Sequence, residues 1–162
     1  MSSSGTPVGV AQASSDSGDD QEAVARLVAT FFAAFRSGPD GPALLSELRG
    51  MFLPHAVVVR TCGTEPAVYG VEEFIAPRQA LLAEGSLVHF TEWAVGGHTE
   101  IFGDIAHHFG SYAKEGVQDG VRFAGRGMKS MQLIRTSQGW RISAVAWDDE
   151  RDGLKVPDEL SG

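Results

Sequence analysis

The stretch from Leu87 to Asp148 constrains the fold most, because long β-prone segments alternate there with short groups of turn residues. The segments are separated by turn residues at Gly96-Gly97, Gly116–Gly120 and Ser137-Gln138-Gly139. The expected strands are Leu87–Val95, Thr99–Ala113, Val121–Thr136 and Trp140–Asp148. Four consecutive strands with short connections favour a sheet that is antiparallel, or mixed at most.

Helical segments are expected before these strands. The first is the clearest, because apolar side chains recur at helical spacing and mark one buried face: Val24, Leu27, Val28, Phe31, Phe32 and Phe35. Asp19 and Glu22 resemble a capping box at its start, and Ser37-Gly38-Pro39 ends it. A shorter helix carries Leu44, Leu45 and Leu48, and a third runs from about Val71 to Ala83. Between them, the β-branched residues 56–62 predict a further strand.

The 162 residues predict one α+β domain with an extension at each end. Residues 1–20 contain six Ser, three Gly and no Lys or Arg, a composition typical of a flexible leader. The folded domain is expected over residues 21–152, and residues 153–162 form a C-terminal tail.

Charge and cysteine content exclude several classes of protein. The formal net charge of −8 argues against binding to nucleic acid. The single cysteine, Cys62, excludes an intrachain disulfide and a multi-thiolate zinc site. No apolar run approaches the ~20 residues that span a membrane, and the first residues lack the features of a secretory signal. We therefore expect a cytoplasmic protein without nucleic-acid or membrane partners.

The order of these elements, with the ending Gly139-Trp140-Arg141-Ile142 and residues 146–150, resembles the nuclear-transport-factor-2-like superfamily. Within it, the chain is most similar to SnoaL-like and ketosteroid-isomerase-like single-domain bacterial proteins, over roughly Asp20 to Asp152. The resemblance implies a cone (a cystatin-like α+β barrel) in which a curved mixed or antiparallel sheet wraps around a long N-terminal helix and holds a ligand pocket. It also implies a homodimer through the outer face of the sheet. Such motifs specify architecture rather than chemistry.

The ketosteroid isomerases in this superfamily rely on three side chains that the resemblance maps onto this sequence. Their oxyanion-donating tyrosine corresponds to Phe31, their general-base aspartate to Arg60, and their proton-donating aspartate to a position near Lys129. Phenylalanine cannot donate a hydrogen bond, and arginine cannot act as a base near neutral pH. The resemblance therefore argues against ketosteroid isomerase activity itself.

Two cations are candidates for binding a ligand. Strand alternation directs Arg60 into the cone with Lys129 opposite, where both would suit a carboxylate, phenolate or enolate. The alternative is an internal ion pair with Glu92, Asp104 or Asp148, or simple exposure to solvent.

The candidate acid–base group is His107. Its strand parity places it on the apolar face formed by Ile101, Ile105 and Phe109, which we expect to be buried. The alternative is a core histidine held by one hydrogen bond. Opposite parity directs His108 and Tyr112 outward or into a dimer contact. Adjacent strand residues cannot chelate one ion together, so no metal site is expected.

Asp148 is a second acid–base candidate, and aromatic side chains complete the candidate site. Trp147 and Asp148 end the last strand and form the pair expected nearest the pocket mouth. The acidic run that Asp148 begins is also typical of a solvated strand end. Phe31, Tyr69 and Trp147 would either line the pocket or fill the core.

The Gly125-Arg126-Gly127 sequence is a fragment of a phosphate-binding loop without its second glycine pair or a following helix. It favours instead a bend with a bulge in a curved strand.

Together these residues predict a pocket for a hydrophobic, anionic small molecule. One hypothesis is a cyclase, dehydratase or isomerase without metal or organic cofactor, in which His107 and Asp148 transfer protons while Arg60 and Lys129 stabilise negative charge. The other is a non-catalytic ligand-binding or dimerisation module of the same fold. A protein-interaction domain is a third possibility, which would require an exposed apolar patch.

Overall fold

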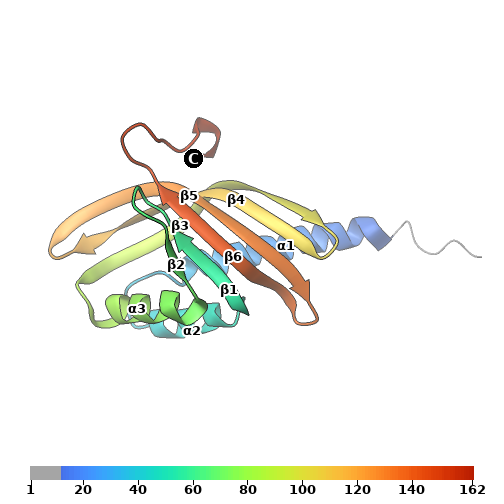
Figure 1. Ribbon diagram of the computed structural model, residues 1–162, viewed down its shortest axis with the longest axis horizontal. Helices are drawn as coiled ribbons and strands as arrows, with labels where there is room; N and C mark the ends of the chain where they lie inside the picture. Colours follow the sequence, from blue (N-terminus) through green and yellow to red (C-terminus); the bar gives the residue numbers. More distant parts are fainter. Residues whose placement is uncertain (1–11) are drawn as a thin grey trace, which may run out of the picture.

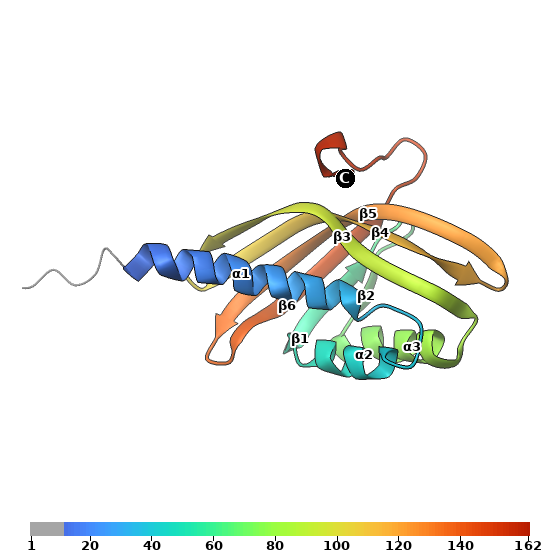
Figure 2. The same ribbon diagram turned by 180° about the vertical axis from the view of Figure 1, so that it is seen from behind.

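The computed structural model describes residues 12–162, which form a curved, open six-stranded sheet with three helices on its concave side (Figures 1 and 2). The helices are α1 (Gln12–Ala33), α2 (Gly41–Arg49) and α3 (Val71–Glu84), and a short 3-10 helix, η1 (Asp158–Leu160), follows the last strand. The strands are β1 (Phe52–Arg60), β2 (Ala67–Tyr69), β3 (Leu87–Phe102), β4 (Ile105–Gln118), β5 (Val121–Thr136) and β6 (Gly139–Asp149). None of these helices is long and apolar enough to cross a membrane.

The sheet is mixed, as the sequence predicted. Its strand order is β2-β1-β6-β5-β4-β3, and only β1 and β6 run parallel among the described strands. The three long strands β3, β4 and β5 extend beyond α2 and α3 and curve around α1 (Figure 2). Residues on one face of this curve enclose the core, and residues on the other face point away from the helices.

The turn between the first two long strands is not where the sequence predicted it. The chain turns at Gly103-Asp104, with Gly103 at φ +56°, whereas Gly96-Gly97 lies inside β3. Gly97 pairs with Gly110 across the ladder, and a Cβ atom on either glycine would lie less than 3.0 Å from the His108 ring. The predicted strand Thr99–Ala113 is therefore two strands, because the glycine pair makes room for a side chain rather than for a turn.

Helix α1 confirms most of the predicted apolar stripe, because five of its side chains are buried: Val24, Leu27, Val28, Phe31 and Phe32. Phe35 is also buried but lies beyond the helix, which ends at Ala33 and not at the predicted Ser37-Gly38-Pro39. The helix begins earlier than the predicted capping box, however. Residues 12–20 were expected in a flexible leader and are helical, whereas residues 1–11 of that leader lie outside the described residues.

Asp20, in the N-terminal half of α1, fixes the helix to the sheet. Its carboxylate accepts hydrogen bonds from both terminal nitrogens of Arg135 on β5, and Trp140 Nε1 on β6 lies 3.4 Å from it. Arg135 Nε also contacts Asp104 Oδ1 at 3.1 Å. The hydrogen bonds from Arg135 lower the pKa of the Asp20 carboxyl below its usual value. A residue assigned to the leader is thus part of the packed structure.

The C-terminal tail returns over the convex face of the sheet, on the side opposite α2 and α3 (Figure 1). Val156 and Leu160 are buried, and the Ser111 hydroxyl on β4 donates a hydrogen bond to the Leu160 carbonyl. The Val156 amide donates to Glu150 Oε2 at 2.8 Å. The tail therefore forms one wall of a groove of about 350 Å³, whose other wall is the convex face around Phe109 and Met128.

Candidate functional site

A cavity of about 240 Å³ lies on the concave face between α3 and the sheet. Aromatic and aliphatic side chains form most of its wall, and a few charged side chains point into it. The lining residues are Phe35, Arg60, Phe74, Arg78, Leu81, Leu82, Leu87, Phe90, Glu92, Tyr112, Lys114, Gln118, Phe123, Lys129 and Trp147. Such an apolar cavity with a few convergent charges is typical of a small-molecule site.

Three of the predicted site residues form a row across this cavity. Arg60 on β1 pairs in register with Trp147 on β6, and Trp147 pairs with Lys129 on β5. Side chains in register on neighbouring strands share a face of the sheet, and all three line the cavity. Arg60 and Lys129 therefore both face the cavity from the same face of the sheet, with Trp147 between them.

Lys129 forms the ion pair that the sequence analysis left as an alternative. Its side chain is only 5% exposed, and its Nζ lies 2.8 Å from Glu92 Oε1 on β3. The ammonium also lies 4.6 to 5.9 Å from the centroids of five aromatic rings: Phe31, Phe32, Phe35, Tyr112 and Trp147. Burial lowers the pKa of Lys129, and the neighbouring Glu92 carboxylate opposes that shift.

Arg78 on α3 is a cavity cation that the sequence analysis missed. Its guanidinium stacks on the Phe74 ring, with Cζ 4.1 Å from the centroid, and lies 5.6 Å from the centroids of Tyr69 and Trp147. Its Nη1 donates to the Phe74 carbonyl at 3.0 Å, one helical turn earlier. Burial lowers the pKa of Arg78 below its usual value, although an arginine stays charged at neutral pH.

Arg60 and Arg78 differ from the other cavity cations in their charge balance. Lys129 pairs with Glu92, and Lys114 pairs with Asp149 at 3.0 Å. Among the side chains that the structure describes, neither guanidinium forms an ion pair with a carboxylate. The cavity therefore carries two positive charges that a ligand can neutralise.

Asp149, rather than Asp148, carries the carboxylate on the concave face. The Tyr112 hydroxyl and Lys114 Nζ both donate to it. Burial alone would raise the pKa of the Asp149 carboxyl, but the hydrogen bond from Tyr112 and the charge of Lys114 outweigh burial and lower it. Burial raises the pKa of the Tyr112 phenol. Near neutral pH the pair is thus a carboxylate that accepts a hydrogen bond from a neutral tyrosine.

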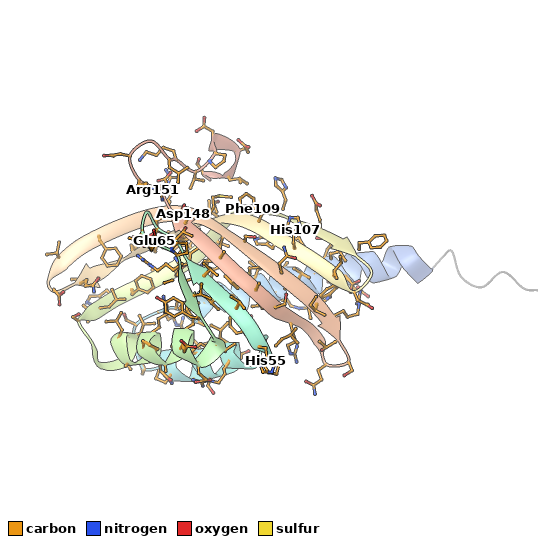
Figure 3. The ribbon with its side chains drawn as sticks, in the orientation of Figure 1. His55, Glu65, His107, Phe109, Asp148 and Arg151 are labelled. Carbon is orange, nitrogen blue, oxygen red and sulfur yellow. The ribbon has the colours of Figure 1, made fainter. Side chains whose placement is uncertain are left out.

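The two predicted acid–base residues lie outside this cavity (Figure 3). Asp148 belongs to the convex groove and forms an ion pair with Arg151 in the next turn of the chain. His107 lies on the convex side of β4, as does Phe109, which is 48% exposed. The prediction that His107 shares a buried face with Ile105 and Phe109 is therefore wrong, since those apolar side chains point away from the core.

Tyr112 and His108 were expected to face outward and instead lie on the concave face. Tyr112 is 1% exposed and lines the cavity. Strand alternation from Tyr112 through Gly110 places His108 on that same face, although it does not line the cavity. Its Nδ1 lies 2.8 Å from the Thr99 hydroxyl oxygen.

Phe31 and Tyr69, the remaining predicted binding residues, lie behind the cavity wall. Phe31 is fully buried, and the centroid of its ring lies 4.9 Å from Lys129 Nζ. The Tyr69 ring lies 6.5 Å from the Phe74 ring and faces Arg78. Both support charged side chains of the cavity rather than line it.

The half-buried position of His108 predicts a pH-dependent stability. Burial lowers the pKa of its imidazole, with smaller effects from His107 and His98, so the folded state favours the neutral ring. The unfolded chain then takes up a proton at a higher pH than the folded chain does, and stability falls as the pH drops below about 6.5. Urea unfolding should show that the free energy of unfolding falls less between pH 7 and pH 5 in His108→Gln than in the wild type. The exposed His55→Gln should behave as the wild type, and equal losses in all three proteins would contradict this placement.

Within residues 12–162, no group of three His, Cys, Asp or Glu side chains is arranged to hold a metal ion.

Of three comparisons with known proteins, only the one with solved structures found matches. No family model matches the sequence, and no curated protein matches it either. Solved structures do match. A hexachlorocyclohexane dehydrochlorinase, LinA-type3, from Novosphingobium barchaimii LL02 has a TM-score of 0.69 and 13% identity over 89% of this chain and 99% of its own. A putative scytalone dehydratase from Novosphingobium aromaticivorans has a TM-score of 0.68 and 10% identity over 89% and 93% of the two chains.

A third structure, a nuclear-transport-factor-2-like protein with a cystatin-like fold from Novosphingobium aromaticivorans, has a TM-score of 0.66 and 18% identity over 93% and 94% of the chains. Identities this low show the fold and leave the chemistry open. The chain has the α+β fold of the nuclear-transport-factor-2-like proteins, as the sequence resemblance implied.

Proposed function

We propose that the concave cavity binds a small hydrophobic molecule with one anionic group, a carboxylate or a phenolate, that pairs with Arg60 and Arg78. The observation that carries this proposal is the pair of guanidiniums that, within residues 12–162, have no carboxylate partner in an aromatic cavity. A charge without a partner is costly away from water, and a guanidinium offers the planar pair of donors that a carboxylate fits. Lys129, which was expected to share this role, is already neutralised by Glu92.

The size of the cavity restricts the ligand. Its volume of about 240 Å³ is below the range of about 300 to 1,000 Å³ that is usual for drug-sized ligands. The stacked rings of Phe90 and Phe123 and the indole of Trp147 offer apolar walls to a flat molecule. A single-ring aromatic acid therefore suits the cavity.

Acid–base catalysis in this cavity is a second candidate function, and Asp149 is the observation that favours it. Matching folds include a dehydrochlorinase and a putative dehydratase. Asp149 does not itself line the cavity, but its carboxylate accepts hydrogen bonds from two residues that do, Tyr112 and Lys114. Since His107 and Asp148 face the convex side, a proton-transfer reaction here would use Asp149 in their place.

Thermal unfolding in the presence of mandelate tests the binding proposal. At a concentration 100 times its Kd, mandelate should stabilise the wild type by about 2.7 kcal/mol, which raises Tm by roughly 5 to 10 °C. The uncharged analogue phenylethanediol should have little effect. Arg60→Met and Arg78→Met should each weaken mandelate binding roughly tenfold or more, because each removes a charge-assisted hydrogen bond.

The exposed Arg26 on α1 provides a matched control, because Arg26→Met removes the same side chain from outside the cavity. This variant should respond to mandelate as the wild type does. The proposal is wrong if phenylethanediol stabilises as strongly as mandelate, or if both cavity variants keep the full shift. The predicted homodimer through the convex face stays a prediction.

A further inference from the structure

Lys129 is the most completely buried amine of the cavity, and anion binding leaves it without a role of its own. The chain has three lysines. Lys155 is exposed on the tail, and Lys114 is about a quarter exposed. Lys129 is 4% exposed, and it is also one of the residues that line the cavity.

The surroundings of Lys129 suit an amine that reacts in its neutral form. Among the residues that the structure describes, its hydrogen-bond partner is Glu92 Oε1 at 2.8 Å, a group that can take a proton from it and return it. The ammonium is otherwise enclosed by aromatic rings. Burial lowers the pKa of Lys129 and Lys114 lowers it further, although the Glu92 carboxylate opposes the shift. Once Glu92 has taken its proton, the neutral amine is a nucleophile.

The row of Arg60, Trp147 and Lys129 sets the spacing between anion site and amine. Neighbouring strands lie about 4.8 Å apart, so the backbones of Arg60 and Lys129 are separated by about 10 Å, with the Trp147 indole between them. Arg78 Cζ and Lys129 Nζ lie 5.6 Å and 5.4 Å from the centroid of that indole. A small acid that rests on Trp147 therefore presents its carboxylate to the guanidiniums and its neighbouring atoms to the amine.

We propose that Lys129 is a nucleophile that forms an iminium with the carbonyl group of a small aromatic oxo acid, whose carboxylate pairs with Arg60 and Arg78. Glu92 moves the protons of this reaction. The inference rests on the proposed function for the carboxylate and adds the carbonyl group to the chemical class of the ligand.

The reaction is a condensation without oxidant or reductant. Glu92 first takes a proton from the Lys129 ammonium, and the amine lone pair then attacks the carbonyl carbon as the C=O π bond breaks. Glu92 protonates the new alkoxide to give a carbinolamine, takes the next proton from Nζ, and delivers it to the hydroxyl group. Water leaves as the C=N bond forms, which regenerates the Glu92 carboxylate and leaves one positive charge on the iminium.

Reductive trapping tests this inference on the full chain. The protein is incubated with phenylglyoxylate and sodium cyanoborohydride and then measured by intact-mass spectrometry and peptide mapping. The expected product is one adduct per chain, on Lys129, with the mass of phenylglyoxylic acid less one oxygen atom. Excess mandelate, which has no carbonyl group, should suppress it by competition.

Lys129→Arg keeps a cation for Glu92 but cannot form the adduct, and Lys155→Arg is its matched control. Circular dichroism and the Tm report whether Lys129→Arg is folded. If this variant does not fold, peptide mapping of the wild type still shows which lysine carries the adduct.

Adduct on Lys155 and Lys114 but not on Lys129 overturns the inference, as does an adduct that mandelate leaves unchanged. If mandelate stabilises the protein and no Lys129 adduct forms, the inference fails while the proposed function stands. If mandelate does not bind either, both fail.

Discussion

Replacing Glu92 with glutamine is expected to lower the free energy of unfolding by about 3 to 5 kcal/mol at pH 7. The variant leaves the Lys129 ammonium in an apolar part of the protein without the carboxylate that lies 2.8 Å from it. The aromatic rings around Nζ compensate in part. Chemical unfolding followed by tryptophan fluorescence measures the loss, because Trp147 lies beside the pair.

The pH dependence of Glu92→Gln separates an unpaired charge from a packing defect. Burial already lowers the pKa of Lys129, and the loss of Glu92 removes the main opposing effect. The folded state then sheds a proton that the unfolded chain keeps up to about pH 10.4, so stability rises with pH over that interval. The variant should therefore be less destabilised at pH 9 than at pH 7.

Glu72→Gln is the matched control, since it breaks the ion pair between Glu72 and Arg49, in which the glutamate is 65% exposed. An exposed pair contributes about 1 kcal/mol or less. A loss in Glu92→Gln no larger than in Glu72→Gln, or one that does not change with pH, would show that Lys129 is not held as a buried cation.

Replacing Gly127 with alanine is expected to destabilise the protein by about 3 kcal/mol and to disturb the cavity. A Cβ atom at this position would lie less than 3.0 Å from the Asp148 carbonyl oxygen and from the Tyr112 hydroxyl. The backbone oxygen is fixed by the ladder between β5 and β6, so the strands must separate or Tyr112 must move away from Asp149. For a domain of this size, Tm should fall by roughly 10 °C.

Gly125→Ala is the control, because Gly125 lies two residues earlier on the same strand and the same face. Its Cβ would meet only the flexible end of Lys114, at 3.2 Å. This variant should lose less than about 1 kcal/mol, since a long side chain can give way. Similar Tm values for both variants would contradict the close packing of Tyr112 over Gly127.

The Gly125-Arg126-Gly127 sequence shows how a local pattern can be misread. It predicted a bulge, but β5 pairs with β4 without interruption, and the bulge between β5 and β6 lies at Gln132 and Leu133. Position 127 requires a glycine because the Tyr112 side chain, from the neighbouring strand, packs directly over it. The partner of a glycine on another strand cannot be identified from the glycine itself.

The parts of the site that the sequence predicted are those that depend on the periodicity of a single helix or strand. The apolar stripe of α1 follows from helical spacing, and Phe31, one of its members, is buried in the core. Strand alternation directed Arg60 into the cone, and Arg60 lines the cavity. These features need only the periodicity of one element.

The acid–base candidates were misplaced because apolar side chains were assumed to point inward. Ile105 is 57% exposed and Phe109 is 48% exposed, so the face that they share with His107 is the convex one. The buried apolar side chains of β4 are instead Ala106 and Tyr112. Only the pairing of β4 with its neighbours and the position of the helices decide between the two faces.

Arg78 could not be found from its sequence position, because its role depends on how α3 lies over the sheet. The helix places it one turn after Phe74, and β6 supplies the Trp147 ring that faces it from another part of the chain. Asp149 differs from Asp148 by one residue, and strand alternation directs the two to opposite faces.

Titration calorimetry with mandelate tests the central claim most directly, namely that Arg60 and Arg78 form an anion site in the concave cavity. We predict one site per chain in the wild type and in Arg26→Met, and a Kd raised roughly tenfold or more in Arg60→Met and in Arg78→Met. Binding that keeps the same Kd in both cavity variants, or no binding to any of the four proteins, would contradict the account.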